Sequence, residues 1–453
     1  MNRTLALFAI VVSVPFVLVA QSVTGTKTPV ALTLKRSIEI ALGQNTQVIL
    51  AQHTVEAQQS NVLAAYGNLL PTVSASASWR RDNVDLERGF FQEGLGFVSR
   101  GVSSTTNSFR TSAGASFTIF DGFGNTASLN RARAGALSSE FSLDRTKQTV
   151  VFTTTQLYLN VLRTEQLLKV AQDNLKRSMR QLERIEESNR IGAVALADVY
   201  RQQVVVGNDE ISMIQAKNNY DRAVADLVYY LGLNALDEYQ FEDPSIPSDV
   251  DTAEFLSVNE RYRDVRSLLD QALELRPDYQ SAIENLNRAR SGVTAARAGH
   301  FPTVSGFTSY ALNSDEISAL ADNRTLTWGI SLRLPIFNGW QIDNAVQQAK
   351  VDRKNAEETL SQAHRQIQVD LRKSLLDLEA AQKRIEVSQK SVQSAEEDRR
   401  IAEERYNLGA GTLLDLLTAN AQYTTAVSNK VNAVYDYILA KRQMEYFLGT
   451  LTS

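Results

Sequence analysis

Apolar residues recur with helical spacing along much of this chain, and the longest such stretch runs from Gln341 to Leu408 without a Gly or Pro. Leu371, Leu378 and Ile385 follow one another at seven-residue steps, and the positions three residues further on hold Ser or Ala. This repeat predicts a helix that packs along its length against other helices. At 1.5 Å per residue it spans roughly 100 Å, so a compact domain cannot contain it.

The stretch has a counterpart earlier in the chain. A shift of 217 residues superposes residues 337–340 (FNGW) on 120–123 (FDGF) and Gly409 on Gly192, and no insertion interrupts the match between residues 120 and 232. Self-similarity of this extent predicts two copies of one structural unit.

Each copy also contains segments in which polar and less polar residues alternate, the pattern of a β-strand with two unlike faces. In the first copy these are residues 72–79 and 109–119, and the polar, glycine-containing stretch Arg80 to Asn107 between them is predicted to be a long exposed loop. In the second copy residues 326–334 alternate most clearly, and the offset between the copies makes the first hairpin loop 14 residues longer.

Strands of about nine to eleven residues with one apolar and one polar face match the wall of a transmembrane barrel. The alternative is a soluble sheet, and aromatic residues near the strand ends favour the membrane. Four strands are too few to close a barrel, since about eight is the small end. The membrane interpretation therefore predicts a barrel shared between several chains.

The helix lengths predict how each copy is built. In the second copy the predicted helices 267–299 and 412–448 together hold about as many residues as the long helix, which indicates that two short helices stack end to end beside one long helix. The first copy has the same parts, beginning with a predicted helix from Leu32 to about Asn68. The proline-containing segment between the copies is then expected at mid-height.

The predicted fold class is mainly α with a small β part and an internal duplication. The predicted segments are a signal peptide at 1–20, a first repeat at 21–232 (β-hairpin 71–120, long coiled-coil hairpin 125–232), an equatorial linker at 233–266, a second repeat at 267–449 (β-hairpin 302–337, long coiled-coil hairpin 341–448) and a tail at 450–453.

The composition fits an exported protein. Arg3, an apolar run from Leu5 to Val19 and the small Ala20 predict a secretory signal, for which a membrane anchor is the alternative. The absence of cysteine excludes disulfides and thiolate metal sites. Because the formal net charge is −4 and the basic residues are spread along the helices, no nucleic-acid partner is expected.

The order and duplication of these pieces resemble the TolC-like outer-membrane efflux protein family over essentially the whole mature chain. The motifs that carry the resemblance are LPTVS at 70–74, FPTVS at 301–305, the FDGF and FNGW corners, and RYNLGAGTLLDLL at 405–417. The resemblance implies a homotrimer with a shared 12-stranded β-barrel in the outer membrane and an α-helical tunnel (an α-barrel) that extends into the periplasm. It also implies passive conduction of drugs, metals or polypeptides in a tripartite efflux or type I secretion system, with a periplasmic adaptor protein, an inner-membrane transporter and outer-membrane lipid as partners.

The two distal turns, 190–198 and 407–415, are the candidate functional tips. Glycine at 192 and 409 suits the positive backbone angle that ends a helix. A carboxylate at 198 and 415 suits the positive dipole end of a returning helix, and an additional gating role is open for both. The tip residues expected to dock the adaptor are Arg190, Ile191, Gly192, Leu408, Gly409 and Gly411.

The resemblance implies that Asp415 faces the tunnel at its periplasmic mouth, where three copies form an acidic, cation-favouring ring. Thr418 stands where a second acidic residue is common in the family, which weakens that selectivity. Tyr406 is similar to a tip tyrosine that hydrogen-bonds a carboxylate of the other hairpin, here Asp198, and holds the mouth closed; packing between helices is its alternative role. Gly411 occupies the place of a basic residue that would assist.

Aromatic residues are expected where the barrel meets the lipid interface. The candidates are Trp79, Trp328, Trp340 and Phe123, with core packing as the alternative for Trp340. Arg110 and Arg333 lie on the polar strand faces and are expected to point into the barrel lumen.

The rival interpretation is an exported coiled-coil scaffold without channel activity, in which the four strand segments need not all alternate. An enzyme finds no support, because the sequence has no nucleophile elbow, phosphate loop or dinucleotide-binding turn. The three histidines are scattered without metal-ligand spacing. Neither catalytic residues nor a cofactor or metal are therefore expected.

Overall fold

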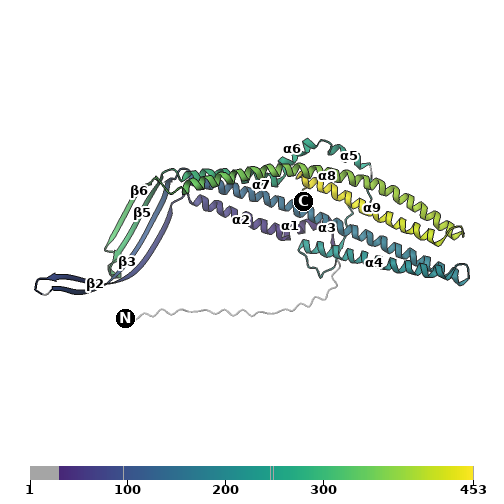
Figure 1. Ribbon diagram of the computed structural model, residues 1–453, viewed down its shortest axis with the longest axis horizontal. Helices are drawn as coiled ribbons and strands as arrows, with labels where there is room; N and C mark the ends of the chain where they lie inside the picture. Colours follow the sequence, from purple (N-terminus) through teal and green to yellow (C-terminus); the bar gives the residue numbers. More distant parts are fainter. Residues whose placement is uncertain (1–29, 95, 245, 248, 252, 452–453) are drawn as a thin grey trace, which may run out of the picture.

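The computed structural model describes residues 30–94, 96–244, 246–247, 249–251 and 253–451. This part of the chain is elongated, and a bundle of long helices leads into a curved sheet at one end (Figure 1). The predicted signal peptide at 1–20 lies outside the described residues.

Two helices of 67 residues run the length of the bundle, α3 (Gly124–Arg190) and α8 (Gln341–Asn407). The length of α8 confirms the prediction from the sequence to within one residue, and its seam residues Leu371, Leu378 and Ile385 are buried. The other helices are α1 (Leu34–Gln44), α2 (Thr46–Gly67), α4 (Leu196–Leu231), α5 (Glu254–Arg261), α6 (Val265–Leu275), α7 (Pro277–Ala298), α9 (Leu413–Leu448) and the short η1 (Ile317–Ala319).

The helices that precede the strands are interrupted, so the predictions of unbroken helices at 32–68 and 267–299 are wrong. Asn45 ends α1 and begins α2, because its backbone is extended and its side chain accepts a hydrogen bond from the N–H of Gln47. Arg276 is extended because it precedes Pro277, which opens α7. The helices α1 and α6, of 11 residues each, are therefore separate from α2 and α7.

The remaining short helices stack in pairs along the long ones, α4 and α2 beside α3, and α9 and α7 beside α8 (Figure 1). At the first junction, Asn45 Nδ2 donates to the carbonyl oxygen of Tyr230 at 3.0 Å. At the second junction, Gln148 Nε2 donates to the carbonyl oxygen of Gly449 at 3.0 Å. The first stack is thus fixed where α4 ends and α2 begins, and at the second junction the end of α9 is tied to α3.

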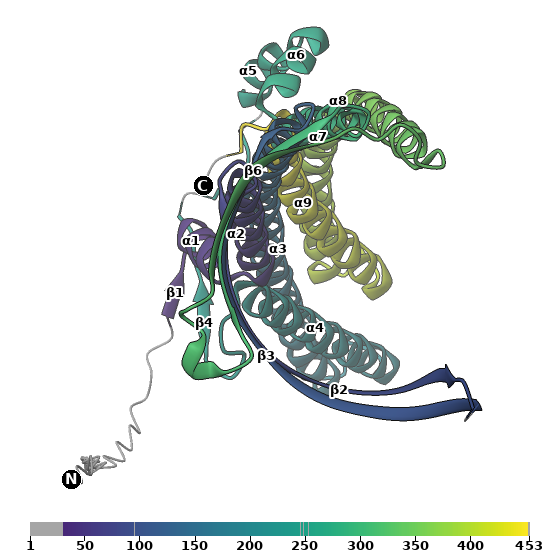
Figure 2. The same cartoon turned by 90° about the vertical axis from the view of Figure 1, so that its left-hand side faces the viewer.

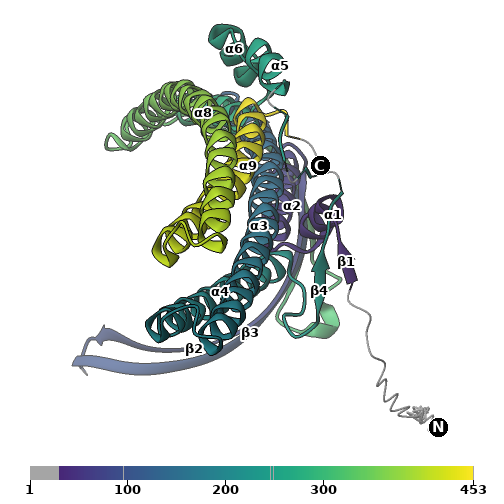
Figure 3. The ribbon, with the colours of Figure 1, turned by 90° about the vertical axis from the view of Figure 1, so that its right-hand side faces the viewer.

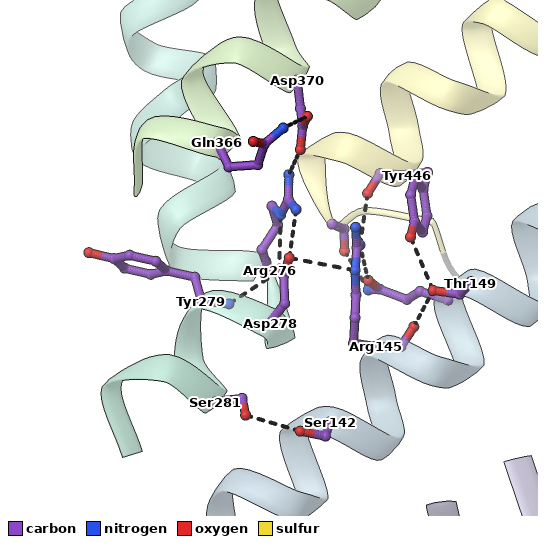
Figure 4. Close-up of polar contacts among 12 residues, drawn as sticks. Ser142, Arg145, Thr149, Arg276, Asp278, Tyr279, Ser281, Gln366, Asp370 and Tyr446 are labelled. Atoms are coloured by element: carbon purple, nitrogen blue, oxygen red, sulfur yellow. Dashed lines mark hydrogen bonds and ion pairs between the residues drawn. The ribbon is translucent and has the colours of Figure 1, made fainter. Parts of the chain in front are cut away.

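Charged side chains fill the second junction (Figure 4). Arg276 lies 2.6 Å from an oxygen of Asp278 and 3.3 Å from an oxygen of Asp370, and its side chain is 4% exposed. The guanidinium of Arg145 lies 3.9 Å from the centre of the Tyr446 ring and 3.8 Å from Asp278. Because these residues come from α3, α8, α9 and the start of α7, the cluster ties the two repeats together.

The strands of both copies form one antiparallel sheet in the order β2-β3-β5-β6. Its strands are β2 (Thr72–Gln92), β3 (Gly96–Phe120), β5 (Thr303–Ser314) and β6 (Arg324–Arg333).

The predicted loop between Arg80 and Asn107 is wrong. The β2 and β3 strands stay paired in register as far as Gln92 and Gly96, and they project as a ribbon beyond β5 and β6 (Figure 2). Polar composition suggested a loop, but each added pair of a hairpin contributes backbone hydrogen bonds whatever the side chains are. Gly94, with a φ of +96°, lies in the turn. The first hairpin therefore has longer strands and a short turn.

The helices form a curved layer, and the segment between the repeats lies on its convex side (Figure 3). There β4 (Tyr239–Phe241) pairs in parallel with β1 (Val30–Leu32). On α5, the ring of Phe255 lies 5.1 Å from that of Tyr437 on α9. The equatorial role of residues 233–266 stays a prediction.

The corner between β3 and α3 leaves no room for a side chain at Gly122. Its φ is +70°, and an added Cβ would lie 2.6 Å from Cβ of Phe301 and 3.0 Å from the carbonyl oxygen of Ala298. We expect Gly122→Ala to destabilise the protein by about 3 kcal/mol, through the left-handed backbone and the packing clash together.

The matched control is Gly339→Ala at the corresponding corner of the second copy. Gly339 has a φ of +63°, and no atom lies within 4 Å of an added Cβ, so the backbone alone should cost about 1 kcal/mol. Thermal unfolding of the detergent-solubilised variants measures the difference. Equal losses at the two corners would contradict the steric argument.

Candidate functional site

The sheet carries hydroxyl groups on one face and apolar side chains on the other. On the hydroxyl face, Thr72 and Ser116 pair across strands with their hydroxyl oxygens 2.8 Å apart, and the hydroxyl oxygens of Ser76 and Ser112 are 2.9 Å apart. The register places on the opposite face Val73, Ala75, Ala77, Trp79, Phe109, Thr111, Ala113, Ala115, Phe117, Val304, Gly306, Thr308, Tyr310, Leu312, Leu326, Trp328, Ile330 and Leu332. The sheet thus separates two unlike environments.

Large side chains of the apolar face are exposed in the single chain. Trp328 is 78% exposed, Ile330 74% and Leu332 70%. Soluble monomers rarely expose a continuous apolar surface of this kind. The face therefore requires an apolar environment outside the chain.

The apolar face has a limited height. Along β3 the apolar face runs from Phe109 to Ile119, about 34 Å at about 3.4 Å per residue. Beyond Phe109 the same side of the strand carries the polar Asn107 and Thr105. A strand tilt of about 40° reduces this length to roughly 25 Å, the height of the apolar band of transmembrane barrels. The band has the dimensions of a bilayer core.

Three of the four aromatic candidates lie near the edges of this band. Trp79 pairs with Phe109 at one edge. Phe123 and Trp340 lie at the strand-to-helix corners of the other edge, where their φ angles are +68° and +65°. A bulky residue in this conformation costs about 1 to 2 kcal/mol, so both copies keep a ring there at some expense of stability. Trp340 is 70% exposed and does not pack in the core of this chain, and Trp328 lies four residues inside β6.

The two hairpin tips end their first helices in the same way. At the first tip, Ala193 N–H donates to the carbonyl oxygen of Ser188 at 2.8 Å, and Gly192 N–H donates to that of Asn189 at 2.9 Å. This pair of bonds is the Schellman motif, and Gly192 has the positive φ, 77°, that it requires. The second tip repeats the bonds from Ala410 to Arg405 and from Gly409 to Tyr406.

The returning helices begin differently. At α9 the hydroxyl of Thr412 accepts the N–H of Asp415 at 3.1 Å, and Asp415 Oδ2 accepts the N–H of Thr412 at 3.1 Å, which makes a capping box. At α4 the capping position holds Ala195, which has no side-chain acceptor, and Asp198 pairs instead with Arg201 at 2.6 Å. The capping role is therefore present at Asp415, and Asp198 has a different partner.

The capping box yields a prediction for both tips. We expect Thr412→Ala to destabilise the second tip by roughly 1 kcal/mol, because the N–H of Asp415 loses its acceptor. Ala195→Thr should stabilise the first tip, since Ala195 already has the extended backbone of a capping residue and Asp198 stands three residues later. Hydrogen exchange of the tip amides measures both changes, and a Thr412→Ala tip that exchanges like wild type would contradict the assignment.

The hydrogen bonds from the Thr412 hydroxyl and backbone N–H hold the pKa of Asp415 below its ordinary value of 3.8. A carboxylate with a lowered pKa stabilises the fold above its unfolded pKa, and that contribution is lost as the pH falls through the folded pKa. The amides of the second tip should therefore be less protected from hydrogen exchange below about pH 3.8.

The two tips face each other across a cleft of about 820 Å³ whose lining includes Asp198, Tyr406 and Leu413. Tyr406 is half-buried beside the apolar cluster of Ile185, Val199 and Leu413. Burial raises the pKa of Tyr406, and the nearby charge of Asp198 adds to the shift. The hydrogen bonds of the described residues do not include one from the Tyr406 hydroxyl to Asp198. In the single chain, Tyr406 packs between the hairpins with Asp198 close by.

Sequence reasoning missed an ion pair between the hairpins. Arg184 of α3 lies 3.4 Å from Glu403 of α8, one to two turns above the tip residues. A coiled-coil pattern gives no signal for it, because charged residues are common at all outward positions of such helices.

The remaining tip candidates are mostly exposed. Ile191 is 74% exposed and Leu408 is 83% exposed, and Arg190 pairs with Glu187 within its own helix. Thr418 donates its hydroxyl to the carbonyl oxygen of Leu414 at 2.8 Å. A Cβ at Gly411 would lie 3.1 Å from Cβ of Arg405, so a larger residue fits there only if the turn shifts.

In the part of the chain that the structure describes, no helix is both long enough and apolar enough to cross a membrane. Among the same residues, no group of three or more His, Asp or Glu side chains is placed to hold a metal ion.

The family model described as outer membrane efflux protein matches residues 37–233 and 268–450 of the chain. The sequence is 26% identical over 368 residues to outer membrane protein TolC of Escherichia coli, covering 76% of this chain and 70% of the relative. It is 24% identical over 402 residues to the probable efflux pump outer membrane protein TtgC of Pseudomonas putida, covering 87% of this chain and 78% of the relative.

A solved structure has the same fold. The CmeC outer membrane channel of Campylobacter jejuni superposes with a TM-score of 0.77 at 20% sequence identity, covering 92% of this chain and 85% of that chain.

Proposed function

Because the chain belongs to the outer membrane efflux protein family, we propose that it forms a channel that passively conducts exported compounds across the outer membrane. The observation that carries this proposal is the apolar face of the sheet, which is exposed in the single chain and has the height of a bilayer core. Four strands cannot close a barrel, so several chains would share one, and the family resemblance favours three chains with twelve strands. The curved layer of helices (Figure 3) supports a tunnel that continues from it.

The proposed partners follow from the two ends of the molecule. Outer-membrane lipid covers the apolar band, with Trp79, Trp328, Trp340 and Phe123 among its aromatic residues. The tips lie at the opposite end, where exposed Ile191 and Leu408 offer apolar contacts to a periplasmic adaptor that connects an inner-membrane transporter. The docking residues are proposed to be Arg190, Ile191, Gly192, Leu408, Gly409 and Gly411.

The mouth of the tunnel is proposed to lie between the tips. Asp415 keeps its capping bonds and adds one negative charge per chain, so three copies give an acidic ring. Tyr406 and Asp198 line the cleft between the two tips. They form the latch that closes the mouth once neighbouring chains narrow this cleft. Thr418, one turn along α9 from Asp415, adds no charge to the ring.

Single-channel recording of the detergent-extracted protein in a planar bilayer tests this proposal. We expect discrete conductance, a smaller cation preference in Asp415→Ala, and a larger conductance in Tyr406→Phe, which keeps the packing and removes the hydroxyl. The rival function is an exported coiled-coil scaffold. Protein that stays monomeric without detergent and conducts nothing would favour the scaffold.

A further inference from the structure

The hydroxyl face of the sheet carries a net positive charge over the height of the apolar band that lies on its other face. At strand positions 72–78, 110–118, 303–313 and 325–333 this face carries mainly Ser and Thr and no carboxylate, and the next residue outwards on β2, Arg80, is paired with Asp82 at 3.1 Å. Within these positions two residues are charged, Arg110 and Arg333, and both are exposed.

Both arginines are available to a ligand. Arg110 Nε donates to Asn313 Oδ1 at 2.7 Å, which orients the guanidinium, and its two terminal nitrogens have no hydrogen-bond partner among the described residues. Within the same part of the chain neither Arg110 nor Arg333 forms an ion pair. Two of the nearby carboxylates are engaged, since Asp82 pairs with Arg80 at 3.1 Å and Asp121 accepts the N–H of Asn125 at 2.6 Å.

The two arginines mark the two ends of the band. In the strand register Arg110 lies opposite Asn313 and Arg333 lies opposite Thr303, so the residues opposite them are ten residues apart on β5. At about 3.4 Å per residue this separation is about 34 Å along the strand, the same length as the apolar band on the other face.

We propose that Arg110 and Arg333 form two positive belts in the channel lumen that favour the passage of anions, including solutes that carry carboxylate, phosphate or sulfate groups. This inference rests on the proposed function, because three chains are needed to turn two arginines into two rings of three. Guanidinium groups are suited to such ligands, which they bind through paired N–H donors.

The field of these belts spans the lumen at moderate ionic strength. Twelve strands about 4.8 Å apart and tilted by about 40° place the wall roughly 12 Å from the axis. The Debye length is about 10 Å at 0.1 M salt and about 3 Å at 1 M, and the long arginine side chains shorten the distance to a passing ion. The preference for anions should therefore be larger at 0.1 M than at 1 M.

The acidic mouth and the positive belts act in series, so the test uses the Asp415→Asn background. Reversal potentials of single channels in a KCl gradient give the ratio of chloride to potassium permeability. We expect this ratio to exceed one, and to fall roughly twofold or more when Arg110→Gln and Arg333→Gln are added. Lysine at both positions should keep the ratio, and the control Arg324→Gln, on the opposite face of β6, should leave it unchanged.

An unchanged ratio in the double glutamine variant, or an equal fall in Arg324→Gln, would overturn the proposal. Should the double variant not assemble, the Asp415→Asn channel alone decides, because an anion preference that does not weaken between 0.1 M and 1 M KCl contradicts the belts. Absence of conductance from the wild-type protein is a different result, since it rejects the channel itself.

Discussion

Replacement of Arg276 by leucine should lower the free energy of unfolding by about 2 to 4 kcal/mol. The substitution leaves Asp370, whose side chain is 16% exposed, without its cation, and leaves Asp278 with the more distant Arg145 (Figure 4). The expected loss lies below that of a fully buried pair because Asp278 is 39% exposed and partly screened by water. Thermal unfolding followed by circular dichroism in detergent measures it.

Arg372→Leu is the matched control, since Arg372 is exposed on the same helix as Asp370 and should change stability little. If Arg276→Leu and Arg372→Leu unfold at the same temperature, the cluster does not hold the junction.

The same cluster predicts a loss of stability in acid. Burial by itself would raise the pKa of Asp278, but the hydrogen bond from Arg276 and the charge of Arg145 outweigh it and hold the pKa below 3.8. The stabilisation is therefore complete above pH 3.8 and is lost as the pH falls through the lower folded pKa. Arg276→Leu should show a smaller loss of stability over that interval than wild type.

Ile330→Lys should prevent assembly in the membrane. Ile330 lies in the middle of the apolar face of β6, and a lysine at the bilayer midplane costs roughly 2 to 4 kcal/mol per chain. In the proposed assembly three chains carry the substitution, so the total cost approaches the whole stability of an ordinary domain. The amount of protein that fractionates with outer membranes as a heat-modifiable oligomer measures the effect.

Ser331→Lys is the adjacent control. Ser331 lies on the hydroxyl face beside Ile330, where a charge remains in water, so assembly should survive. Equal tolerance of the two lysines would mean that neither face contacts lipid.

The sequence predicted the elements whose signals are local. The absence of Gly and Pro predicts the long helix α8, and the burial of Leu371, Leu378 and Ile385 follows from their spacing. The alternation in β6 is an equally clear signal, since one face of this strand is apolar from Leu326 to Leu332. These features depend on periodicity alone, which tertiary contacts reinforce here rather than oppose.

The errors arose where a weak local signal competed with pairing or capping. The break at Arg276 was readable from Pro277, because the residue before proline avoids the helical conformation. The polar composition of the segment from Arg80 to Asn107 predicts a loop, although backbone pairing does not require apolar side chains.

Some polar contacts can be predicted from the sequence, and others can be found only in the structure. The capping box of Thr412 and Asp415 follows a spacing that the sequence displays. The Arg276 cluster joins residues from four helices, and no spacing in the sequence brings them together.

The lipid exposure of β6 tests the proposed membrane channel most directly, and the absence of native cysteine makes single labels straightforward. Spin labels attached one at a time to cysteines at positions 326–332 in liposomes report collisions with oxygen, which partitions into lipid, and with a water-soluble nickel chelate. We predict oxygen contact at 326, 328, 330 and 332 and chelate contact at 327, 329 and 331. Chelate contact at every position would contradict a membrane-spanning strand.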